Sequence, residues 1–136
     1  MDIKNSIIRE TEIEHPTITD MNFLYGTIFT FEALDKNNHS RNVCVFADGE
    51  VDRSPTGTGV SARAAVHFKR GEIKLNETLT IESILGSTFK VSVLRETKLG
   101  SLNAIIPEVE GTANIVGKNT FWIDPDDDIG QGFMLR

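Results

Sequence analysis

Residues 52–59, with the sequence DRSPTGTG, contain the groups best suited to bind a small charged molecule. The pattern predicts a strand that ends near Asp52, a Ser-Pro turn, and a helix that begins at the glycines. The first amides of a helix have no intrahelical acceptor, and Gly57 and Gly59 let the backbone approach a ligand, so a carboxylate or phosphate can bind there. The carboxylate of Asp52 suits an ammonium or iminium group. An anion site beside an acid is what an amino-acid zwitterion requires.

The same stretch is also compatible with a simple capped turn. In that alternative Ser54 or Thr56 caps the helix, the glycines relax the backbone, and Asp52 is solvated. The spacing lacks the third glycine of a dinucleotide-binding fingerprint and the Gly-Lys-Ser/Thr of a P-loop, so a nucleotide is the poorer ligand. From the residues alone, a capped turn and an amino-acid site both remain open.

Other residues capable of chemistry have no suitable partners in the sequence. Residues 124–128 (DPDDD) resemble part of a calcium loop, but the glycine comes one position late and the proline suits an acidic surface turn. The histidines show no metal-ligand spacing: His15, His39 and His67. The single cysteine, Cys44, lies in an apolar run that predicts a buried strand, and it excludes an intramolecular disulfide. The sequence therefore predicts no metal site and no Ser-His-Asp triad.

Length and charge narrow the class of protein. The chain has 136 residues, with 14 Lys and Arg against 20 Asp and Glu, and a formal net charge of −6. This length suits a single domain, residues 1–136. The acidic balance argues against a nucleic-acid partner. No apolar run approaches membrane-spanning length and the first residues lack the apolar segment of a secretory signal, so we expect a cytoplasmic protein with no membrane partner.

The elements that position the candidate site are predicted from hydrophobic periodicity. Residues 57–70 are apolar nearly all round, which predicts a helix buried on most sides, with Gly71 as its stop. Residues 1–15 are charged and partly periodic, which predicts a second helix before Pro16. Alternating, β-branched and aromatic residues predict strands at 23–34, 41–47, 77–83, 89–95, 104–109, 112–116 and 120–123. About seven strands with one or two helices indicate an α+β fold with mainly antiparallel pairing.

Together with its flanking residues, the 52–59 stretch is similar to a known motif. DRSPTGTG followed by Ser61-Ala62-Arg63 resembles the second-half active-site motif of the proline racemase family, which also includes 4-hydroxyproline epimerases and trans-3-hydroxy-L-proline dehydratases. The segments GTIFTF, SRNVCVFADGEVDRSP and FWIDPDDDIGQGF also look family-like, so the resemblance spans nearly the whole chain. It implies a diaminopimelate-epimerase-like fold, in which each half wraps strands around a central helix, here about residues 57–70. It also implies a reaction on proline or hydroxyproline that needs no cofactor.

The resemblance implies a role for each of four residues. Asp52 binds the ring nitrogen, the N–H groups of Gly57 and Thr58 bind the carboxylate, and Thr56 faces the reacting carbon. In racemases and epimerases of the family the position of Thr56 is cysteine, one of two thiols that move a proton across Cα. An alkyl hydroxyl is too weak an acid to replace that thiol, so racemisation is disfavoured. Threonine is similar to the dehydratase branch, in which one cysteine removes the Cα proton, the 3-hydroxyl leaves, and the product tautomerises to pyrroline-2-carboxylate.

The length of family members sets a further expectation. They are more than twice as long, and their first catalytic cysteine lies in an N-terminal motif that this sequence lacks; Cys44 belongs to the strand before the second motif. We therefore expect a C-terminal half, with residues 1–15 as a linker helix, that is inactive without the other half. The alternatives are a non-catalytic remnant, and a racemase or epimerase that tolerates Thr56. A homodimer, or a protein that covers the surface left by the missing half, is the expected macromolecular partner.

Overall fold

The computed structural model describes residues 2–130 and 132. Its elements in chain order are α1 (Asp2–Glu10), a short 3-10 helix η1 (Thr19–Met21), β1 (Gly26–Phe31), β2 (Ser40–Phe46), β3 (Glu50–Val51), α2 (Gly57–Lys69), β4 (Thr78–Glu82), β5 (Thr88–Leu99) and β6 (Leu102–Glu110). Neither α-helix of this part of the chain has the length and apolar character needed to cross a membrane. Gln131 and Phe133, at the end of the FWIDPDDDIGQGF motif, lie outside the described residues.

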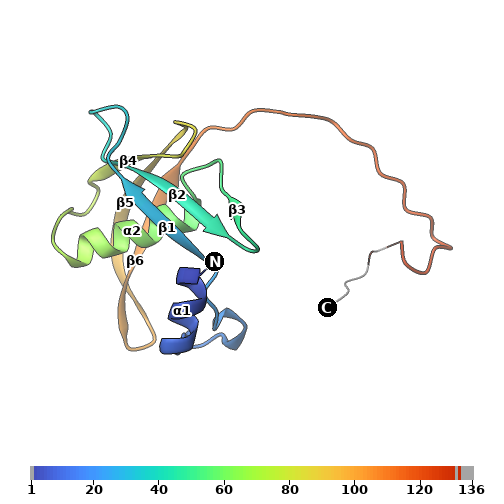
Figure 1. Cartoon of the computed structure of the whole chain (residues 1–136), viewed down its shortest axis with the longest axis horizontal. Coiled ribbons are helices and arrows are strands. Elements are labelled where there is room, and N and C mark those ends of the chain that lie inside the picture. The colour runs from blue at the N-terminus through green and yellow to red at the C-terminus, as the bar shows by residue number, and fades with distance from the viewer. Residues whose placement is uncertain (1, 131, 133–136) are drawn as a thin grey trace.

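The strands form a single, mainly antiparallel sheet in the order β1-β2-β4-β5-β6, with β3 paired to β2 (Figure 1). β1 and β2 form an antiparallel pair that begins at Gly26 and Phe46. β2 and β4 are parallel, with Ser40 beside Ile81. Parallel neighbours need a crossover connection, and α2 provides it because it lies between β3 and β4 in the chain. Because the other strand pairs are antiparallel, the predicted mainly antiparallel pairing is confirmed. The sheet is accompanied by two α-helices.

Helix α2 contacts strands from both ends of the sheet, so the sheet curls around it (Figure 1). At the β1 end, a Cβ added to Gly59 would lie 2.3 Å from Cδ1 of Ile28, so only glycine allows this close approach without a shift. The core lies between α2 and the middle strands and consists of Val60, Ala64, Ile73, Leu79, Ile81, Val91 and Val93. The structure thus confirms a helix over nearly all of residues 57–70, packed against the sheet.

The prediction that this helix is buried on most sides is confirmed only in part, because one stripe of the helix, Thr58, Ala62, Val66 and Lys69, is exposed. The buried residues of α2 are Gly59, Val60 and Ala64, which face the sheet. Ala62 is exposed, and Val66 is 45% exposed. Apolar residues around a helix favour burial, but a sheet of this size covers only the side that it contacts.

The strands predicted at residues 112–116 and 120–123 are also wrong. After β6, the chain from residue 111 to residue 130 runs away from the sheet without pairing to any described strand (Figure 1). Val116 is 100% exposed and Trp122 is 94% exposed. β-Branched and aromatic side chains favour an extended backbone, but a strand also needs a neighbour that supplies hydrogen-bond partners.

Candidate substrate-binding site

The loop between β3 and α2 is folded around the carboxylate of Asp52. The Asp52 amide donates to the Cys44 carbonyl (3.0 Å), which places the residue beside the end of β2. Its side-chain oxygens then accept two hydrogen bonds, from the Ser54 amide to Oδ1 (2.8 Å) and from the Thr56 hydroxyl to Oδ2 (2.9 Å). The first of these contacts is an Asx-turn, which Asp forms readily. The acid predicted to bind an amine is therefore also the centre of its own loop.

Thr56 is held in a backbone conformation that is unusual for a β-branched residue. Its φ of +69° lies in the left-handed region, and the residue is 8% exposed. Its carbonyl accepts from the Val60 amide (2.8 Å) and so begins α2. Its hydroxyl bonds Asp52 rather than an amide of the helix, and Ser54 makes no side-chain bond to the helix either. The simple capped turn, with Ser54 or Thr56 as the side-chain cap, is therefore not formed.

The first amides of α2 are free to receive an anion. Within the described residues, the N–H groups of Gly57 and Thr58 have no hydrogen-bond acceptor. A Cβ added to Gly57 would meet no atom within 4 Å, so the space beside this amide is open. Gly59 differs, because its side of the helix is packed against Ile28. The expectation that both glycines admit a ligand is therefore wrong for Gly59, whose small size serves packing.

The carboxyl of Asp52 is held in its ionised form. Partial burial by itself raises the pKa of this group, but the hydrogen bonds from Ser54 and Thr56 outweigh burial and hold the pKa below its ordinary value. The positive charge of Arg53 acts in the same direction. Each oxygen of a carboxylate can accept more than one donor, so both can still bind an ammonium group. The loop thus presents a negative carboxylate and, beyond Thr56, two free amide donors.

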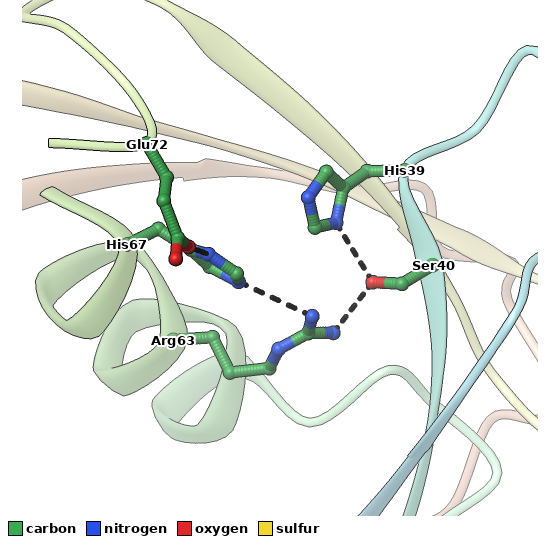
Figure 2. Close-up of polar contacts among 5 residues, drawn as sticks. All are labelled: His39, Ser40, Arg63, His67 and Glu72. Carbon is green, nitrogen blue, oxygen red and sulfur yellow. Dashed lines mark hydrogen bonds and ion pairs between the residues drawn. The ribbon is translucent and has the colours of Figure 1, made fainter. Parts of the chain in front are cut away.

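A second polar cluster lies between α2 and β2, behind this loop (Figure 2). Nη1 of Arg63 donates to the Ser40 hydroxyl (2.6 Å) and to Oδ1 of Asn42 (2.8 Å). Nη2 faces Nε2 of His67 (3.3 Å), and the other ring nitrogen of His67 bonds Glu72. No role for these residues is predicted from the sequence. The available signal was Ser40 and Asn42 at alternate positions of a strand, which places both side chains on one face.

His39 completes the cluster. Its ring lies edge-on to the ring of His67, with the centroids 4.9 Å apart, and Nδ1 lies 2.9 Å from the Ser40 hydroxyl. Burial, then the neighbouring His67 and Arg63, lower the pKa of His39, whereas Glu72 raises it. Two histidines that the sequence left unrelated are therefore in contact.

The structure also places the other residues singled out from the sequence, Cys44 and the acidic residues 124–128. Cys44 is 3% exposed on β2, which confirms the predicted buried strand. Residues 124–130 form turns in which the Asp126 amide donates to Asp124 and the Ile129 amide to Asp127. Across residues 2–130 and 132, no three His, Cys, Asp or Glu side chains are grouped so as to hold a metal ion.

Residues 52–58 lie apart from three cavities of the described chain. The described chain has a cavity of about 640 Å³ between α2 and β6, lined in part by Val66 and Ile105. Smaller cavities of about 520 Å³ and 240 Å³ adjoin α1. Asp52, Thr56 and Thr58 line none of the three.

Known proteins match nearly the whole chain. The proline racemase family model matches residues 1–134. A trans-3-hydroxy-L-proline dehydratase of Colwellia psychrerythraea is 50% identical over 134 residues, which cover 98% of this chain and 38% of that protein. A proline racemase of Clostridioides difficile is 39% identical over 140 residues, which cover 100% of this chain and 41% of that protein.

A solved structure agrees with these sequence matches. The structure of a hydroxyproline epimerase from Agrobacterium vitis, with bound trans-4-OH-L-proline, is similar with a TM-score of 0.82 and 32% identity, over 99% of this chain and 38% of that chain. The chain thus spans well under half the length of the relatives that it matches. Because the family model covers almost every residue, the chain belongs to the proline racemase family.

Proposed function

We propose that residues 52–58 form one wall of a pocket for a cyclic amino acid, and that the opposite wall comes from a complementary N-terminal half. The observation that carries the proposal is the arrangement around Thr56. An ionised carboxylate lies on one side, and the free amides of Gly57 and Thr58 begin the helix on the other. Asp52 binds the ring nitrogen and the two amides bind the carboxylate of the substrate.

We further propose that the reaction is the dehydration of trans-3-hydroxy-L-proline. A base of the complementary half removes the Cα proton, the C3–O bond breaks, and the hydroxyl leaves as water after it gains a proton. The resulting enamine tautomerises to pyrroline-2-carboxylate. Thr56 cannot serve as the second base of a racemase because an alkyl hydroxyl does not ionise near neutral pH, and its proton is engaged with Asp52. We propose Thr56 instead as the pocket hydroxyl that faces the reacting carbon.

The fold supports the same division into halves. The curled sheet around α2 is what a diaminopimelate-epimerase-like half requires, and we propose that residues 1–136 correspond to the C-terminal one, with α1 in the linker. In that arrangement the exposed Val66 on α2 and the exposed segment after β6 lie against the complementary half or a second copy of the chain.

A reconstitution assay tests the reaction. The chain is incubated alone, and with the separately expressed N-terminal half of a family dehydratase, with trans-3-hydroxy-L-proline, L-proline or trans-4-hydroxy-L-proline. We expect pyrroline-2-carboxylate only from the combined halves and only from the 3-hydroxy substrate. Deuterium exchange at Cα of L-proline or trans-4-hydroxy-L-proline would instead favour a racemase or epimerase. Folded, associated halves without either reaction would identify a non-catalytic remnant.

A binding assay tests the wall itself. In nuclear magnetic resonance titrations we expect trans-4-hydroxy-L-proline to shift the amide signals of Gly57 and Thr58. Loss of one charge-assisted contact in Asp52→Asn should weaken binding about tenfold or more. L-Proline methyl ester lacks the carboxylate and N-acetyl-L-proline lacks the ammonium group, so both should fail to bind. Equal shifts with either derivative would contradict zwitterion recognition.

A further inference from the structure

We propose that Asn42 and Arg63 are positioning residues that fix the orientation of the Pro55–Thr56 peptide and thereby aim the binding loop. The inference rests on the proposed function, since it assigns the support for the same site. Neither residue belongs to the DRSPTGTG loop, and both lie behind it, on β2 and α2. Their effect on a ligand passes through main-chain atoms of the loop.

The Pro55–Thr56 peptide is held at both of its polar ends. The Pro55 carbonyl accepts from Nδ2 of Asn42 (3.0 Å), and the Thr56 amide donates to the Ser54 hydroxyl (3.0 Å). A peptide unit is planar, so two bonds on opposite ends fix its rotation about the chain. That rotation sets φ of Thr56, which is +69°, a value that a β-branched residue adopts only when its surroundings require it. Without the bond to Asn42, the peptide can turn toward the ordinary negative φ.

Asn42 is directed at Pro55 by Arg63. The side chain of Asn42 is completely buried, and its Oδ1 accepts from Nη1 of Arg63 (2.8 Å). A guanidinium can only donate, so the atom of Asn42 that faces Arg63 must be the oxygen. The amide nitrogen therefore points to the Pro55 carbonyl. The orientation of the Asn42 side-chain amide is therefore set by its two hydrogen-bond partners.

Arg63 is itself oriented by neutral acceptors. Its described partners are the hydroxyl of Ser40 and Nε2 of His67, which Figure 2 shows, and the amide oxygen of Asn42. Because Arg63 donates, Nε2 of His67 is an acceptor, so Nδ1 carries the ring proton and donates to Glu72. Burial lowers the pKa of Arg63, and no carboxylate among these direct partners compensates its charge. Arg63 therefore acts on these partners through directional hydrogen bonds rather than through an ion pair.

The variant Asn42→Asp isolates the proposed contact. Aspartate has nearly the same shape and still accepts from Arg63, but it cannot donate to the Pro55 carbonyl while ionised. We expect φ of Thr56 to leave the left-handed region in the crystal structure of the variant. In titrations of the full chain with trans-4-hydroxy-L-proline, we expect the affinity of Asn42→Asp to fall about tenfold, because the N–H groups of Gly57 and Thr58 no longer point toward the ligand. Arg63→Lys keeps the positive charge but loses the forked donors of the guanidinium. It should therefore shift the amide signals of Gly57 and Thr58 in the same direction as Asn42→Asp does.

A matched control separates positioning from general destabilisation. Val93→Ala weakens the core cluster on β5, of which Asn42, Pro55 and Arg63 are not members, and should leave φ of Thr56 and the affinity unchanged at equal or greater loss of stability. An unchanged loop and affinity in both Asn42→Asp and Arg63→Lys would overturn the inference, as would an equal effect of Val93→Ala. If Asn42→Asp does not fold, Arg63→Lys decides between the outcomes. If the unaltered chain binds no probe, the proposed function fails, and the Thr56 backbone in the variants still decides the positioning role.

Discussion

At the scale of single residues, Thr56 combines a strained backbone with a fully engaged hydroxyl. A non-glycine residue in a sparsely populated backbone region costs about 1–3 kcal/mol. A hydrogen bond to a charged group contributes about 1.5–3 kcal/mol, and Thr56 makes one to the ionised Asp52. The two effects are of similar size, so the loop keeps its shape at little net cost. The hydroxyl thereby lies next to the carboxylate that we propose to bind the ring nitrogen.

Gly57→Ala should separate stability from binding. The added Cβ meets open space, and Gly57 does not need a positive φ, so we expect the free energy of unfolding to stay equal or to rise by about 0.4–1 kcal/mol. The same methyl group occupies the space beside the free amide, so the affinity for trans-4-hydroxy-L-proline should fall. Urea denaturation and amide-shift titration measure the two quantities. Gly71→Ala is the control: with φ of +73° it should lose stability and keep its affinity. Full affinity in Gly57→Ala would show that the ligand does not approach this amide.

At the scale of elements, strand β2 and its neighbours carry the support for the site. Ser40, Asn42 and Cys44 lie on the face of β2 that meets α2, and the two polar side chains reach Arg63. The loop from β1 to β2 is held by a different residue, the buried Glu82 at the end of β4. Its carboxylate accepts from the Leu34 amide (2.7 Å), the Asp35 amide (2.9 Å) and the side chain of Asn38 (2.8 Å).

Glu82 should make stability depend on pH. The hydrogen bonds from Asn38, Asp35 and Leu34 lower its pKa in the folded state, so the unfolded chain takes up a proton first as the pH falls. The contribution of Glu82 is therefore complete above the unfolded pKa of about 4.3 and is lost as the pH falls through the lower folded pKa. We expect Glu82→Gln to be less stable than the unaltered chain at pH 6, with a smaller difference at pH 3, in urea denaturation. Glu110→Gln, at an exposed ion pair, should have little effect at either pH. A pH-independent difference for Glu82→Gln would contradict the assignment.

How far the sequence predicts an element depends on where its partners are. Helix α2 was predictable because its start and stop are local signals, the glycines after Pro55 and Gly71. The strands expected at residues 112–116 and 120–123 failed because β-propensity does not specify the neighbour that a strand needs. In the candidate site, the loop residues follow from the motif. The support from Asn42 and Arg63 does not, because it depends on a contact between β2 and α2 that only the folded chain creates.

At the scale of the whole molecule, the chain exposes far more surface than a compact monomer of its size. Its accessible surface is 10894 Å², whereas a folded monomer of 15.1 kDa exposes about 7,100 Å². Part of the excess lies in the segment after β6, where Ile115, Val116, Phe121 and Trp122 are at least 86% exposed. Large exposed apolar groups of this kind mark contacts with another protein surface. In the function proposed above, a complementary half or a second copy of the chain covers them.

Limited proteolysis should cleave the segment after β6 first. Chymotrypsin cleaves after aromatic residues, and Phe121 and Trp122 lie on backbone that has no strand partner within the described chain. We expect rapid cleavage there and slow cleavage at Phe89, which packs against the core. Mass spectrometry of the fragments measures the order. Addition of the complementary half should protect residues 121 and 122. Protection that rises with the concentration of the chain alone would identify a second copy as the cover, and equal rates at all three sites would contradict an open segment around a stable core.

Two of the groups that hold the loop act on main-chain atoms: Asn42 on the Pro55 carbonyl and Ser54 on the Thr56 amide. The hydroxyl of Thr56 adds its own bond to Asp52, but these two contacts do not depend on the side chain at position 56. In evolutionary terms, this part of the support is independent of the residue at position 56. Under the proposed function, a lineage can exchange threonine for the cysteine that the sequence resemblance places here in racemases and epimerases, while these main-chain contacts of the proposed binding loop persist. One amino-acid replacement at an unchanged loop is then a short path between different reactions on the same class of substrate.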